Sequence, residues 1–165
     1  GRFSRRGLLA DAKAALEDLQ RRPAIDPDRI AVYGVSLGGV LGLALAAERQ
    51  EVRAAVSLAA FSSWSRIARD HFGWLGWLLA RPGLDADESI SRLGARPALI
   101  VHGGLDDIVP PSHAERLKAS ADAAGVAAEL LLVPGAGHND LAIGDPETQA
   151  RIVEFLRRCL APAPG

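Results

Sequence analysis

A five-residue stretch at positions 34–38, Gly-Val-Ser-Leu-Gly, constrains the fold more than any other feature of this sequence. It follows residues 29–33, a short apolar and partly β-branched run that predicts a buried strand. It precedes residues 39–48, an almost wholly apolar run that predicts a buried helix. A serine between a strand and a helix lies on a tight turn that exposes its hydroxyl, and glycines allow the backbone to pass close by. Ser36 is therefore a candidate nucleophile, and an ordinary turn serine is the alternative.

Apolar runs at residues 52–58, 98–101 and 128–133 predict three further strands. Apolar residues at helical spacing predict a helix from Leu8 to Leu19, which Pro23 closes, and two more helices after the third and fourth strands. Strands that alternate with helices indicate an α/β fold: a mostly parallel sheet with helices on both faces. In such sheets the chemistry gathers at the carboxyl ends of the strands.

Two helix starts carry local signals. Ser112 and Glu115 have the spacing of a capping box, which predicts a helix beginning near Ser112. The last helix is expected to begin at Asp145-Pro146, with the aspartate as N-cap and the proline in the first helical position.

The composition indicates one globular domain over residues 1–165 and excludes several classes of protein. A net charge of −1 argues against a nucleic-acid partner, because phosphate binding needs a basic surface. No apolar run approaches the length of a transmembrane segment. Cys159 is the only cysteine, so no intrachain disulfide can form; the cellular location stays open, with the cytoplasm favoured.

A base and an acid follow the third and fourth strands. Residues 101–110 contain His102, Asp106 and Asp107, and residues 133–140 contain His138. A serine becomes a nucleophile when a base takes its proton and an acid orients that base. The order Ser36, Asp106, His138 fits this chemistry. Asp107 is the alternative acid, and a surface role is the alternative for His138.

These motifs together resemble the α/β-hydrolase fold, over nearly the whole chain. Residues 34–39 look like its nucleophile elbow, residues 102–110 like its acid loop and residues 135–138 like its histidine loop. The lead-in at residues 26–30 and the Gly-His-Asn-Asp ending most resemble dienelactone-hydrolase-like, acyl-peptidase-like and depalmitoylase-like members.

The resemblance implies a serine hydrolase that cleaves a carboxylic ester, thioester or amide of a small-molecule, acyl or peptide substrate through an acyl-enzyme. Ser36 would attack, His138 would act as base and then acid, Asp106 would orient His138, and the backbone N–H of Leu37 would be an oxyanion donor. No cofactor is implied.

The other three histidines are not expected to be catalytic. His102 ends a buried strand and is expected to be a hydrogen-bonded structural residue. His113 is expected to be solvated in the first turn of a polar helix, and His71 to be a surface or packing residue. Since the histidines lack ligand spacing and there is one cysteine, no metal site is expected.

An insertion of about residues 61–93 separates the second and third strands. Its apolar residues recur at helical spacing, and it holds all three tryptophans. In the resembled family a cap at this place covers the site, so we expect an apolar substrate pocket that includes Trp64, Phe72, Trp74 and Trp77. The alternative is a plain amphipathic helix packed on the core.

The family sheet usually has eight strands, and this chain supplies candidates for the last four. It therefore looks like the C-terminal part of such a domain, without the strands that precede the elbow. The sequence also contains no methionine, even at position 1, which fits this expectation. The strand at residues 30–33 would then lie at an exposed edge, which invites self-association. The alternative function is an incomplete or non-catalytic hydrolase-derived domain that needs an upstream segment or partner.

Overall fold

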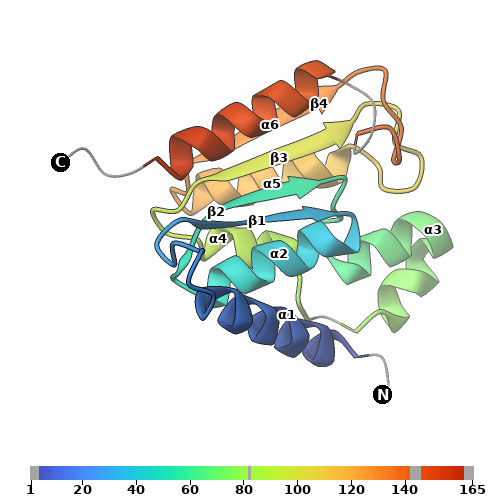
Figure 1. The fold of residues 1–165 in the computed structure, drawn as a ribbon. Helices are drawn as coiled ribbons and strands as arrows, with labels where there is room; N and C mark the ends of the chain where they lie inside the picture. The colour runs from blue at the N-terminus through green and yellow to red at the C-terminus, as the bar shows by residue number, and fades with distance from the viewer. Residues whose placement is uncertain (1–3, 82, 142–145, 162–165) are drawn as a thin grey trace.

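The computed structural model describes residues 4–81, 83–141 and 146–161. Its sheet has the strand order β1 (Ile30–Val35), β2 (Val52–Leu58), β3 (Ala98–Gly103) and β4 (Ala128–Val133). All neighbouring strands are parallel, so the predicted parallel sheet is confirmed. The carboxyl ends of the four strands consequently share one edge of the sheet (Figure 1).

Helices cover both faces of this sheet (Figure 1). One face packs against α1 (Arg5–Gln20), α2 (Leu37–Glu48), α4 (Ala86–Ser91) and α5 (Ser112–Ala123), whose buried residues share one core. The other face packs against α6 (Pro146–Cys159). The remaining helix, α3 (Trp64–Leu79), projects beyond the carboxyl edge of the strands.

The two cores follow from the alternation of side chains along the strands. Ala55 and Ile100 face the core shared with α2 and α5, whereas Val56 and Leu99 face α6 and pack with its Phe155. Runs of apolar residues on both faces are what a parallel sheet buried on both sides requires. This explains why the largely apolar runs of β2 and β3 could be identified from sequence.

β1 is an outer strand of the described sheet, as expected from the sequence. Its Tyr33 is 47% exposed. The free edge of β1 therefore offers unpaired backbone groups to another strand.

The structure differs from the sequence-based expectations at two helices. The helix α4 was not expected, and α5 is capped by Pro111 with no side-chain hydrogen bond, so the predicted Ser112–Glu115 capping box does not form. Pro111 already has helical backbone angles, which moves the cap one residue earlier. Pro146 begins α6 as predicted, and the expected cap Asp145 lies outside the described residues. Among the described helices, none has both the length and the apolar character to span a bilayer.

Candidate active site

The turn between β1 and α2 holds Ser36 in a backbone conformation that few residues other than glycine adopt. Its φ is 52° and its ψ is −119°. The Ser36 N–H donates to the carbonyl of Leu58 at 2.8 Å, which fixes the turn to the end of β2. The Ser36 hydroxyl does not cap α2, and it makes no hydrogen bond within the described residues. Such strain is typical of functional positions, and here it presents the hydroxyl at the carboxyl edge.

Gly34 is required by this turn. A Cβ at Gly34 would lie 2.1 Å from the carbonyl oxygen of Gly38, whereas a Cβ at Gly38 would meet no atom within 4 Å. Leu37 is the first residue of α2, where the backbone N–H has no partner within the helix. A donor and the positive end of the helix therefore lie directly beside the serine.

Asp106 lies in the loop after β3 and is almost fully buried, with 4% of its surface exposed. Its Oδ1 accepts the backbone N–H groups of Ile108 at 3.0 Å and Val109 at 2.7 Å. These two bonds fix the carboxylate and leave Oδ2 to face other side chains. Its neighbour Asp107 is exposed.

His138 lies in the loop after β4, and its Nδ1 is 2.7 Å from Oδ2 of Asp106. A carboxylate can only accept, so Nδ1 carries a proton, and in the neutral ring Nε2 then keeps its lone pair. This is the tautomer that a general base needs. The structure thus brings two of the three predicted triad residues into contact, and it places Ser36 at the same edge of the sheet.

The acid and histidine loops can meet because Gly103 has no side chain. A Cβ there would lie 2.3 Å from the carbonyl oxygen of Ala136. The N–H of Leu105 donates to that same carbonyl at 2.9 Å. The backbone of one loop therefore rests on the backbone of the other, which sets the spacing of Asp106 and His138.

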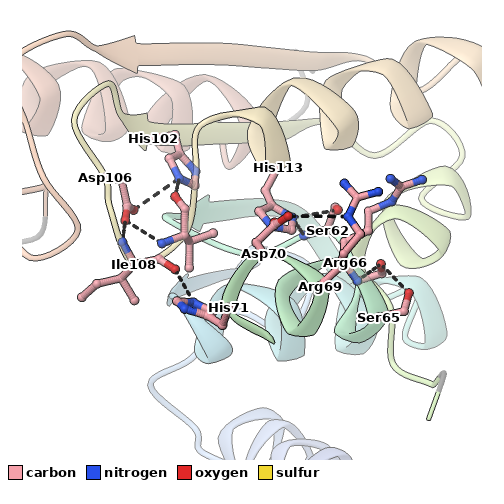
Figure 2. Close-up of polar contacts among 12 residues, drawn as sticks. Ser62, Ser65, Arg66, Arg69, Asp70, His71, His102, Asp106, Ile108 and His113 are labelled. Atoms are coloured by element: carbon pink, nitrogen blue, oxygen red, sulfur yellow. Dashed lines mark hydrogen bonds and ion pairs between the residues drawn. The ribbon is translucent and has the colours of Figure 1, made fainter. Parts of the chain in front are cut away.

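His102 supports the same carboxylate from within the core. It is fully buried, its Nε2 donates to the carbonyl of Val109 at 2.8 Å, and that nitrogen lies 3.3 Å from Oδ2 of Asp106. Its Nδ1 has no hydrogen-bond partner among the described residues. Burial lowers the pKa of His102, which favours the neutral ring. The expected hydrogen-bonded structural role agrees with this geometry (Figure 2).

The expectation that His113 is solvated is wrong, because only 1% of it is exposed. Its Nδ1 lies 2.9 Å from both the backbone nitrogen and the hydroxyl of Ser62, and its Nε2 lies 2.9 Å from Oδ2 of Asp70. Burial lowers the pKa of His113, although Asp70 acts in the opposite direction. The partners come from distant parts of the chain, so no local signal could have revealed this network (Figure 2).

The insertion of residues 61–93 contains α3 and α4. His71 of α3 is exposed, yet its Nε2 contacts the carbonyl oxygen of Ile108 at 2.9 Å, so α3 touches the acid loop directly (Figure 2). Trp64 packs edge-on against Phe61 and under the guanidinium of Arg5. The other three predicted pocket residues, Phe72, Trp74 and Trp77, are more than half exposed.

Comparison with known proteins places this arrangement in a family. The model of the prolyl oligopeptidase family matches residues 6–163. The chain belongs to the prolyl oligopeptidase family. It is similar to the acylaminoacyl peptidase of Pyrococcus horikoshii, with a TM-score of 0.80 and 18% identity over 94% of this chain and 28% of that one. The expected resemblance and the α/β-hydrolase fold are confirmed.

Two mycobacterial proteins add to this comparison. A puromycin-hydrolyzing peptidase of Mycobacterium tuberculosis has a TM-score of 0.76 and 25% identity, over 93% of this chain and 25% of that one. An uncharacterized protein of the same species is 42% identical over 97% of this chain and 54% of its own length. The chain spans about half the length of the curated relatives it matches. The family and its structural neighbours are hydrolases, which supports a function of the serine-hydrolase type.

Proposed function

We propose that Ser36, Asp106 and His138 form the catalytic triad of a hydrolase that cleaves a carboxylic ester, thioester or amide. The 2.7 Å contact between His138 Nδ1 and Asp106 Oδ2 carries this proposal. It is supported by the strained backbone of Ser36 and by the order of the three residues in the chain.

In this mechanism His138 Nε2 takes the proton of the Ser36 hydroxyl while Oγ attacks the substrate carbonyl. The negative charge on the tetrahedral oxygen is stabilised by the N–H of Leu37 and the start of α2. His138 then protonates the leaving group, and an acyl-Ser36 ester remains. Water, deprotonated by His138, releases the acid and restores the serine. Asp106 holds the tautomer and stabilises the charged ring throughout.

We further propose that α3 helps to bind the substrate. Trp64, which packs against Phe61 at the start of α3, would contribute to an apolar pocket for the acyl or aromatic part of a small-molecule, acyl or peptide substrate. Phe72, Trp74 and Trp77, the other predicted pocket residues, would lie at its exposed outer end. The contact from His71 to Ile108 supports this, because it joins the insertion to the acid loop.

The test is hydrolysis of p-nitrophenyl esters by the complete gene product. Ser36→Ala should reduce kcat by several orders of magnitude, because removal of the nucleophile leaves only binding and oxyanion stabilisation. Ser112→Ala is a matched control, since Ser112 is exposed and its side chain does not cap α5. Equal activity of Ser36→Ala and wild type would exclude the triad.

A second candidate function is a hydrolase-derived domain that is inactive without another segment. Two observations favour it: the Ser36 hydroxyl has no hydrogen bond within the described residues, and β1 ends the described sheet. It predicts that this chain alone is inactive and that the complete gene product is active, or that neither is active.

A further inference from the structure

The hairpin made by α3 has an exposed apolar end. Residues 72–80 form a run of nine without a charged, hydroxyl or amide side chain. Six of these residues, which we call the apolar tip, are between 49% and 76% exposed: Phe72, Trp74, Leu75, Trp77, Leu78 and Leu79. Contiguous exposed apolar surface of this kind marks an interaction site in a folded protein.

The shape of α3 presents this surface outward. Gly73 has a φ of 64° and a ψ of −154°, so the helix breaks there into two halves. A Cβ at Gly76 would lie 2.2 Å from the carbonyl oxygen of Ala68, which shows that the second half folds back on the first. Figure 1 shows the two halves beyond the carboxyl edge of the sheet, away from both cores.

The base of the hairpin is fixed to the core, just before the apolar tip. Asp70 pairs with the buried His113 at 2.9 Å, and His71 contacts the carbonyl of Ile108 at 2.9 Å (Figure 2). Since Asp70 holds α5 and His71 holds the acid loop, rotation of the hairpin onto the sheet would break both contacts. These two contacts therefore hold the tip away from the described sheet.

The charged residues around the apolar tip indicate which kind of partner it can bind. Between Asp70 and Asp85 the sequence has no carboxylate, and its only charged residue is Arg81. Asp70 is bound to His113 and also pairs with Arg69 at 3.8 Å, and Asp85 accepts the N–H groups of Trp64 and Gly83. Arg66 and Arg69 lie on the first half of the hairpin. Asp107, in the loop that His71 contacts, is an exposed carboxylate on this side.

We propose that the apolar tip inserts into the surface of an anionic membrane. Tryptophan prefers the interface between lipid headgroups and acyl chains, and leucine and phenylalanine bury deeper. Arg66 and Arg81, which form no ion pair among the described residues, supply the attraction to anionic lipid, whereas Arg69 is paired with Asp70. This proposal does not depend on the catalytic role of Ser36, because binding to lipid is measured without substrate.

The chain carries its own reporter for this test, because all three of its tryptophans lie in α3. In the complete gene product, the difference between the wild type and Trp74→Phe with Trp77→Phe gives the emission of these two residues. Vesicles of phosphatidylcholine with phosphatidylglycerol should shift their emission to the blue, and lipids brominated in the acyl chains should quench it. Vesicles of phosphatidylcholine alone, or added salt, should give weaker binding.

Substitution of the tip separates this insertion from adsorption. Trp74→Ser with Trp77→Ser should reduce cosedimentation of the complete gene product with anionic vesicles by at least about tenfold, because burial of one large apolar side chain contributes more than one factor of ten. Val153→Ser is a matched control, since Val153 is 43% exposed on α6. It should bind as the wild type does.

Three results would overturn the proposal. One is the absence of both the blue shift and cosedimentation in the wild type. Another is equal loss of binding in the control. The third is shielding of Trp74 and Trp77 from acrylamide without lipid, measured as the difference between the complete gene product and its variant Trp74→Phe with Trp77→Phe. The tip would then be covered by protein, either a second copy or another segment of the same product.

Discussion

Asp106→Asn should lower kcat by about 10⁴-fold while the fold remains intact. Oδ1 of the new amide can still accept the N–H groups of Ile108 and Val109, so the loop keeps its anchors. At the Oδ2 position an amide N–H₂ would face His138 Nδ1, which is 2.7 Å away, and two donors cannot bond to each other. His138 must then carry its proton on Nε2, where it cannot act as a base.

The cost to stability should be modest. The variant loses one charge-assisted hydrogen bond, which contributes about 1.5–3 kcal/mol, out of a total of roughly 5–15 kcal/mol for a typical domain. Ester hydrolysis and thermal unfolding should be measured together on the complete gene product. Asp107→Asn is the control, since Asp107 is exposed, and it should retain wild-type kcat within about twofold. A larger loss in Asp107→Asn than in Asp106→Asn would refute the assignment of the acid.

Three further predictions concern the fold. Gly34→Ala should destabilise the domain strongly, because its Cβ would lie 2.1 Å from the carbonyl oxygen of Gly38. Gly38→Ala has open space around the new Cβ and should be tolerated. Similar melting temperatures for the two variants would contradict this prediction. Burial lowers the pKa values of His102 and His113, so below about pH 6.5 the unfolded chain binds more protons than the folded one. The free energy of unfolding should therefore fall as the pH is lowered below about 6.5. Denaturant titrations that show no such fall would disprove the effect. The 165-residue chain should self-associate through the edge of β1, and Tyr33→Lys should reduce the mass seen by sedimentation; a monomeric wild-type chain would argue against it.

The sheet could be predicted from the sequence because its signals are local. The bounds of β2 and β4 match the apolar runs, and the contact between Asp106 and His138 agrees with the order of the motifs after β3 and β4. The turn at Ser36 was predictable because glycine, strand and helix signals are adjacent in the chain.

The features that were missed depend on contacts between distant segments. His113 lies in a polar helix, and it is buried through its contacts with Ser62 and Asp70, which are far away in sequence. Gly73 and Gly76 interrupt the helical spacing of the insertion, but a glycine by itself does not indicate that the chain reverses, so the hairpin was not predicted. The short helix α4 is rich in acidic and hydroxyl side chains, and its place is fixed by packing against α2 and α5.

The most direct test of the central claim is the site at which a fluorophosphonate probe labels the complete gene product, located by peptide mass spectrometry. The serine nucleophile predicts one phosphonylated residue, Ser36, with labelling that is abolished in Ser36→Ala and strongly slowed in His138→Ala. Labelling of another serine, or labelling that persists in Ser36→Ala, would contradict the assignment of Ser36 as the nucleophile.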